Sequence, residues 1–339
     1  MIIEAYNFMR VVLTFFIFLY HYFVHTSSVT NDTHSLFLTF EFSTAPTICF
    51  FIMSGALLYN RYKKDLNIKS FYEKRFLHVL LPYYIVYLYQ YIKTAIALHT
   101  PFFVEGSKFK ILLFILALDG YMNKYFSTYH MNTGEWFLGI LVILYILYPI
   151  LVKLLDKFGR AYVVFIYLIF IIRLFFPFDY AIKDFVFCLT AFSTGMFISK
   201  YDYLNMKKSS YINFLLLCIL VLRFNGGIRN MNQFLYILLY SVMGYILIYN
   251  FGNMFLKNNQ NKLVKNTFTF LSSISYEFFL LHHIVILRLV NKINAEKFIS
   301  NYYYRLIYFF VMIIIIIALA YILHKIVIII INTFYKRGI

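Results

Sequence analysis

Charged residues are scarce in this chain. Only 13% of its 339 residues are Asp, Glu, Lys or Arg, whereas 62% are hydrophobic and the mean hydropathy is +0.74. Soluble domains carry about 25% charged residues, so this composition excludes a soluble globular fold. The chain is also far longer than one membrane span requires, which predicts a polytopic membrane protein.

Acidic residues and cysteines are also few. The 14 Asp and Glu residues stand against 31 Lys and Arg residues, which leaves a formal net charge of +17. The basic residues lie in short segments between apolar runs, where they set membrane orientation, so nucleic acid is not an expected partner but anionic lipid is. Cys49, Cys188 and Cys218 lie far apart inside apolar runs. Because they show no metal-ligand spacing, we expect core residues and no metal site.

Long, continuous apolar runs are abundant, and they predict an all-α fold. We predict about ten transmembrane helices, at residues 5–25, 43–60, 76–98, 136–152, 161–177, 184–199, 211–224, 232–250, 267–290 and 304–331. The run 109–118 is about ten residues long and is flanked by charges, so we interpret it as a re-entrant or interfacial helix in an outer loop.

The distribution of basic residues predicts the topology. With the N-terminus inside, most lysines and arginines of the loops lie on the inner side, so both termini are expected to be cytoplasmic. The first helix lacks a small-residue cleavage site and is expected to remain as a span. We detect no internal repeat or soluble segment, and we expect a single integral-membrane domain over residues 1–339.

The first predicted helix carries Arg10 towards its inner end and His21 towards its outer end. Arg10 and His21 have ten residues between them, so helical geometry places both on one face, about 16 Å apart along the axis. Ionisable side chains are costly in hydrocarbon and normally face a bundle interior or a wet cavity, where they are functional. The alternative is that each side chain reaches the headgroups at its own end of the helix.

A basic cluster precedes the third predicted span. Lys74, Arg75 and His78 lie within about one helical turn of one another. Such a cluster is most often a signal of topology only. It also suits phosphate groups, which arginine can bind through two parallel hydrogen bonds.

The ninth predicted span carries Glu277 near its middle and His282 towards its outer half. A carboxylate at mid-membrane is more often functional than structural. Glu277 and His282 point about 140° apart around the helix, so we do not expect them to face each other.

Other stretches contain residues suited to packing or to sugar binding. Gly55, after Ser54, is expected to allow a second helix to approach closely. Trp136, the single tryptophan, is an expected anchor at the outer interface, and Glu135 beside it is an expected outward-facing carboxylate. Asp119, in the outer loop 99–135, is a further candidate for hydrogen bonding to a sugar.

In this order, the stretches resemble integral-membrane acyltransferase family 3, whose members O-acylate surface polysaccharides and other envelope molecules. The resemblance rests on Arg10 with His21, Pro46 to Gly55 (Pro-x-x-x-Phe-Phe-x-x-Ser-Gly), Arg75 before Pro82 and Tyr83, Trp136 to Pro149, and Ser275 to His282. Together these motifs cover the chain from about residue 5 to residue 290, although residues 153–266 contain none of them.

Two motifs depart from the family pattern. His78 stands where the family has the second arginine of an Arg-x-x-Arg pair, so binding of the donor rests on Arg75, with Lys74 as its substitute. Leu141 and Val142 stand where many relatives have two glutamates. A carboxylate role cannot be transferred to those positions.

The resemblance implies a membrane O-acyltransferase that moves an acetyl group from cytoplasmic acetyl-CoA to a glycan hydroxyl. His21 would be the general base or a transient acyl carrier, Arg10 would orient the donor, and Glu277 is the third catalytic candidate. The expected residues for binding the phosphates of acetyl-CoA are Arg75, Lys74 and His78. The expected residues for binding the acceptor are His282, Glu135 and Trp136.

The expected acceptor is a cell-surface or lipid-linked glycan, such as a capsule, an exopolysaccharide or a wall polymer. The bias towards Ile, Phe, Tyr, Asn and Lys suggests an AT-rich bacterial genome, so we expect a multi-pass protein of the bacterial cytoplasmic membrane. The acyl group, the oligomeric state and the choice between base and carrier are left open by the sequence.

Two other classes of protein share this composition. A glycan polymerase or flippase would also be rich in Tyr and Phe, but we would expect arginines in several central spans, where only Arg173 and Arg223 occur. A non-catalytic sensor or transporter is the third class. Stabilisation by acetyl-CoA would distinguish the enzyme from such a protein.

Overall fold

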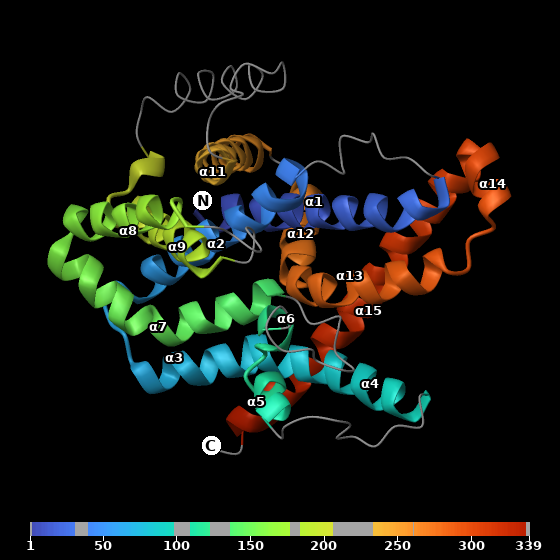
Figure 1. Ribbon diagram of the computed structural model, residues 1–339, viewed down its shortest axis with the longest axis horizontal. Helices are drawn as coiled ribbons and strands as arrows, with labels where there is room; N and C mark the ends of the chain where they lie inside the picture. Colours follow the sequence, from blue (N-terminus) through green and yellow to red (C-terminus); the bar gives the residue numbers. More distant parts are fainter. Residues whose placement is uncertain are drawn as a thin grey trace. The chain divides into compact units, whose positions relative to one another are not determined.

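The regular structure of the chain is helical. The computed structural model describes residues 2–30, 40–97, 109–122, 136–176, 184–205, 233–259 and 261–336. These residues form helices and no strand (Figure 1), which confirms the all-α prediction for the described part of the chain. The predicted span 211–224, with Cys218, lies outside the described residues.

The described residues contain the following helices, given in chain order. Their bounds are α1 (Ile2–Thr30), α2 (Phe40–Tyr62), α3 (Ile68–Arg75), the π-helical turn η2 (Phe76–Leu80), α4 (Leu81–Ala97), α5 (Phe109–Ile115), α6 (Asp119–Met122), α7 (Trp136–Phe158), α8 (Arg160–Arg173), α9 (Phe185–Lys200), the 3-10 turn η4 (Tyr203–Asn205), α11 (Gln233–Asn258), α12 (Lys262–Ser273), α13 (Ser275–Val290), α14 (Ala295–Ser300) and α15 (Tyr302–Lys336).

Several helices are long and apolar enough to cross a membrane. Four meet this condition alone: Glu4–Ser27 in α1, Trp136–Phe158, Phe234–Lys257 in α11 and Tyr302–Tyr335 in α15. A fifth is counted if α12 and α13 form one span. The protein is therefore a helical membrane protein, whereas ten spans and cytoplasmic termini remain predictions.

The predicted ninth span, 267–290, is not one straight helix. It is divided into α12 and α13, which are bent by 64° at Ile274. Serines surround the break, and the hydroxyl of Ser273 donates to the Phe270 carbonyl at 2.7 Å. Serine side chains that bond to local backbone groups compete with the helical pattern, so the break has a local cause.

Contacts divide the chain into two compact units. Unit 1 comprises residues 1–17, 39–66 and 146–273, and unit 2 comprises the remaining residues. Helices α1 and α7 each continue from one unit into the other. The single domain over residues 1–339 remains a prediction.

Unit 1 is built around the close pairing of α2 and α9. A Cβ added at Gly55 would overlap the Phe192 carbonyl, and one added at Gly195 would overlap the Ile52 carbonyl. The two helices therefore approach through glycine, which confirms the packing role expected of Gly55. Helices α8 and α11 also pack in this group. Its buried cysteines, Cys49 and Cys188, are core residues as expected.

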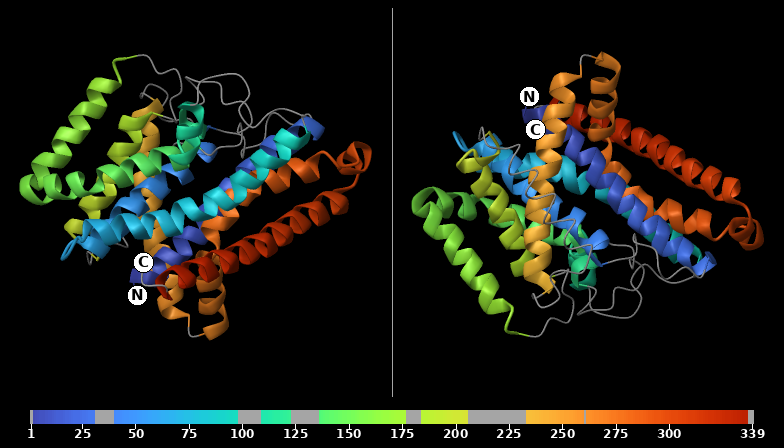
Figure 2. Two further views of the ribbon diagram at one scale, coloured as in Figure 1. Left: turned by 90° about the horizontal axis from the view of Figure 1, so that it is seen from below. Right: turned by 90° about the horizontal axis from the view of Figure 1, so that it is seen from above.

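Unit 2 contains a helical hairpin and a long composite rod. Helices α13 and α15 lie side by side, and α14 connects them (Figure 2). Helices α3, η2 and α4 continue directly into one another. On α15, apolar side chains spaced seven or eight residues apart are exposed, among them Ile307 (60%), Ile314 (63%) and Ile329 (64%). Such a face suits contact with lipid.

Candidate functional site

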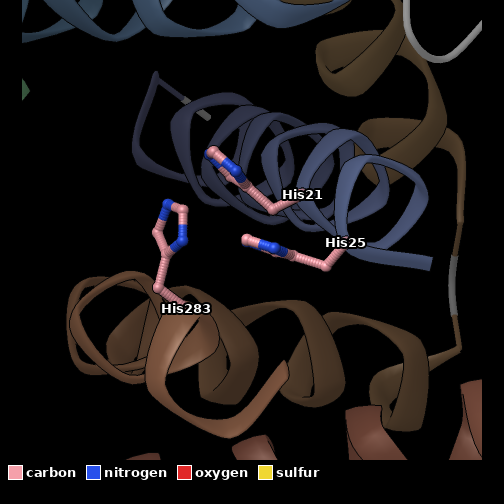
Figure 3. A group of neighbouring side chains, drawn as sticks. All are labelled: His21, His25 and His283. Carbon is pink, nitrogen blue, oxygen red and sulfur yellow. The ribbon is translucent and has the colours of Figure 1, made fainter. Parts of the chain in front are cut away.

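Four histidines from two helices gather within unit 2. His21 and His25 lie one turn apart on α1, and His282 and His283 are adjacent on α13. The ring centroid of His21 is 5.0 Å from that of His282 and 3.8 Å from that of His283. Figure 3 shows His283 reaching from α13 towards the rings of His21 and His25. The structure therefore brings together His21 and His282, which the sequence singled out separately.

Burial differs within this histidine cluster. His282 is 1% exposed, whereas the other three rings are only partly buried. The Nδ1 of His282 donates to the Phe279 carbonyl of its own helix, because a carbonyl oxygen can only accept. The Nε2 of His282 is then the acceptor in the neutral ring, and it has no hydrogen-bond partner among the described residues.

Glu277 pairs with a histidine that the sequence analysis did not single out. Its Oε1 lies 2.7 Å from the Nδ1 of His324, on α15. The other carboxylate oxygen, Oε2, is buried and has no hydrogen-bond partner in the described part of the chain. A buried carboxylate held against an imidazole can fix the orientation of that ring.

Arg10 has polar neighbours within unit 1. Its Nη1 donates to the Ser272 hydroxyl at 3.5 Å, and that hydroxyl donates to Asn7 Oδ1 at 3.0 Å. Both contacts join α1 to the end of α12, just before the break at Ile274. The sequence prediction that Arg10 and His21 belong to one helix is confirmed by the extent of α1.

The basic cluster lies where α3 passes into a π-helical turn. Lys74 and Arg75 end α3, and the exposed His78 lies within η2. The Arg75 guanidinium stands 5.8 Å from the Phe71 ring centroid and 5.6 Å from that of Tyr145. Single π-helical turns occur frequently at functional sites. The Arg75 Nε is buried without a hydrogen-bond partner among the described residues.

Asp119, Trp136 and Glu135 were expected on the acceptor side. Asp119 is 2% exposed and accepts a hydrogen bond from Tyr83 Oη at 2.8 Å, and burial raises the pKa of its carboxyl to about 6. The expectation that Asp119 faces a sugar is therefore wrong, because its carboxylate is buried and hydrogen-bonded to the Tyr83 phenol. Trp136 begins α7 and is partly exposed, whereas Glu135 lies outside the described residues.

The sequence analysis missed three histidines of unit 2: His25, His283 and His324. The i, i+4 spacing of His21 and His25 was a usable signal, because it places two rings on one helical face. One ring nitrogen from each of His21, His25 and His283 lies within 4.8 Å of the other two, an arrangement that can hold a metal ion. The prediction that the protein has no metal site rested on the spacing of the cysteines. That spacing carries no information about these histidines.

Comparison with known proteins identifies the family of the chain. A family model described as an acyltransferase domain, that of acyltransferase family 3, matches residues 3–325 and so includes all four histidines of the cluster. No curated protein and no solved structure matches the chain. The chain therefore belongs to acyltransferase family 3 and is a membrane acyltransferase.

Proposed function

We propose that this acyltransferase transfers an acetyl group from cytoplasmic acetyl-CoA to a hydroxyl of a cell-surface or lipid-linked glycan in the bacterial cytoplasmic membrane. The observation that carries the proposal is the contact of His21 with His282, at 5.0 Å between ring centroids, in a chain of the acyltransferase family. Imidazoles titrate near neutrality and serve as bases or nucleophiles in acyl transfer.

In the first route, His21 acts as a general base. A ring nitrogen of His21 takes the hydroxyl proton of the acceptor while the hydroxyl oxygen attacks the thioester carbonyl. The carbon–sulfur bond then breaks, and the departing thiolate of CoA recovers the proton from His21. The ester product and free CoA balance the reaction.

In the second route, His21 carries the acetyl group. Its ring nitrogen attacks the thioester carbonyl, the carbon–sulfur bond breaks, and CoA leaves as a thiolate. The acceptor hydroxyl then attacks the acetyl-imidazole, its proton passes to the thiolate, and neutral His21 is restored. The buried His282 and its Nε2 lone pair support either route, because they can orient a hydroxyl or His21 itself.

The basic cluster supports binding of the donor. The Arg75 guanidinium lies beside two aromatic rings, and Lys74 precedes it at the end of α3. The phosphates of acetyl-CoA suit such a pair, with the exposed His78 as a third contact. Arg10 is proposed to orient the donor. Glu277, held by His324, is proposed as the third catalytic group.

Membership in an acyltransferase family favours this proposal over a glycan polymerase, a flippase or a non-catalytic transporter. An acetyl-CoA-dependent rise in the melting temperature in detergent would support the enzyme, since a ligand bound only by the folded state stabilises it. Unchanged melting at saturating acetyl-CoA would favour another donor or another class of protein.

The deciding experiment follows label from radioactive acetyl-CoA into surface glycan in membranes that contain wild type, His21→Ala or Leu263→Ala. Leu263 is 74% exposed and serves as the control for an alanine substitution. We expect transfer by wild type and the control and a loss of about 10²–10⁴-fold for His21→Ala at equal protein levels. Full transfer by His21→Ala would overturn its catalytic role.

The same label separates the two routes. Without acceptor, the carrier route predicts acetyl label on wild-type protein that hydroxylamine removes, whereas His21→Ala stays unlabelled. The general-base route predicts no labelled protein under these conditions.

A further inference from the structure

We propose that His21, His25 and His283 form a binding site for one divalent transition-metal cation, with Zn²⁺ as the representative ion. The three residues come from α1 and α13 (Figure 3). One ring nitrogen from each lies within 4.8 Å of the other two. The site lies wholly within unit 2.

The geometry is close to that of a three-histidine metal site. Nitrogens bound to one tetrahedral Zn²⁺ at about 2.0–2.1 Å lie about 3.3 Å apart. Rotations of the His25 and His283 rings that move each nitrogen by about 1 Å would shorten the nitrogen–nitrogen distances from 4.8 Å to that spacing. The i, i+4 spacing of His21 and His25 is the spacing by which helices present two histidines to a zinc ion.

The chemistry of the three ligands selects the kind of cation. Neutral imidazoles bind Zn²⁺, Cu²⁺, Ni²⁺ and Fe²⁺ well, whereas Mg²⁺ and Ca²⁺ prefer oxygen ligands. All three rings are partly exposed, so an ion can reach them. Three protein ligands leave a fourth position for water or for an oxygen ligand.

The neighbouring His282 makes the surroundings polar. Its ring centroid lies 4.5 Å from that of His283, and its Nε2 is buried without a hydrogen-bond partner among the described residues. A water held by the cation at its open position could donate a hydrogen bond to this nitrogen. Such second contacts commonly tune the affinity of metal sites.

The test measures metal binding alone, so its outcome does not depend on the proposed acyl transfer. The full chain, purified in detergent with a histidine-free affinity tag, is dialysed against micromolar free Zn²⁺, and metal per chain is measured by atomic emission. We expect one Zn²⁺ per wild-type chain, and no bound Mg²⁺ in a parallel sample dialysed against Mg²⁺ in place of Zn²⁺. A wild-type chain that binds no Zn²⁺ would overturn the site.

Matched histidine variants locate the ion. The double variant His25→Gln with His283→Gln is expected to bind Zn²⁺ at least about tenfold more weakly, whereas His78→Gln, at an exposed histidine, keeps the wild-type stoichiometry. Equal binding by the double variant would overturn the assignment. Circular dichroism and gel filtration check that the double variant is folded. The visible spectrum of bound Co²⁺ gives a second readout, with loss of its tetrahedral bands expected in the double variant.

Discussion

The two units of this protein treat buried polar atoms differently. In unit 2, ionisable side chains hold buried polar atoms without a hydrogen-bond partner among the described residues: Arg75 Nε, Asp119 Oδ2, Glu277 Oε2 and His282 Nε2. In unit 1, the comparable atoms are the hydroxyl oxygens of Thr14, Ser199 and Ser241.

This difference in the type of unpartnered buried atom distinguishes groups that serve packing from groups that serve chemistry. A hydroxyl inside a helix can rotate to bond with a nearby carbonyl at small cost, and unit 1 gains its tight α2–α9 contact through glycine. Unsatisfied ionisable groups cost far more and persist where a ligand or a reaction uses them. We therefore expect substitutions in the α2–α9 contact of unit 1 to act mainly on folding, and substitutions at the ionisable groups of unit 2 named above to act mainly on chemistry or pH dependence.

The largest expected effect is a loss of stability when the helix packing of unit 1 is disrupted. Gly195→Ala would drive a Cβ into the Ile52 carbonyl of α2 and is expected to cost about 3 kcal/mol or more of stability. Gly244→Ala is the matched control, because its added Cβ would lie 4.0 Å from Cys49 Sγ. Melting temperatures in detergent should fall only for Gly195→Ala. Equal melting of the two variants would contradict the glycine-mediated contact.

The next effect is a pH dependence in unit 2. The folded-state pKa of Asp119 is raised from 3.8 to about 6 by burial, so its contribution to stability is complete below pH 3.8 and is lost as the pH rises through 6. Asparagine does not ionise, so Asp119→Asn removes this pH-dependent loss of stability. Its amide oxygen can still accept a hydrogen bond from Tyr83. The variant should gain up to about 3 kcal/mol over wild type between pH 4 and pH 8.

Melting curves across this pH range check the Asp119 prediction. Asp65→Asn, at an exposed carboxylate, controls for the loss of one negative charge. A stability difference between Asp119→Asn and wild type that is the same at every pH would refute the prediction.

A smaller effect concerns the Glu277–His324 pair. His324→Leu removes the 2.7 Å contact and leaves both oxygens of a buried carboxylate unsatisfied, which is expected to cost about 1–3 kcal/mol. Replacing both residues by leucine should recover more than half of that loss of stability. The melting temperatures of wild type, the two single variants and the double variant give a double-mutant cycle that measures the interaction. Additive losses would show that the two side chains do not interact.

The smallest predicted effect is inhibition of acyl transfer by Zn²⁺ bound at the proposed metal site. A neutral imidazole has one nitrogen lone pair, so His21 cannot bind Zn²⁺ and accept a proton or an acetyl group at once. At a Zn²⁺ concentration ten times the dissociation constant, transfer should fall about tenfold. A chelator should restore it, and Mg²⁺ should have no effect. Faster transfer with Zn²⁺ would mean that the ion assists the reaction.

Much of the fold was predictable from local pattern. Continuous apolar runs identified the helical membrane class, and α1, α7, α11 and α15 occur where spans were predicted. The motif order identified acyltransferase family 3, and Gly55 was recognised as a packing position. These features depend on composition and helical period, which neighbouring residues determine.

The sequence by itself determined that the protein is helical, that it lies in a membrane, that Arg10 and His21 share one helix and that the chain belongs to an acyltransferase family. Only the tertiary structure decided that His21 meets His283, that His324 holds Glu277 and that Asp119 turns inwards. Contacts between distant helices depend on the rotation and axial position of each helix, and helical periodicity within one segment does not fix either quantity.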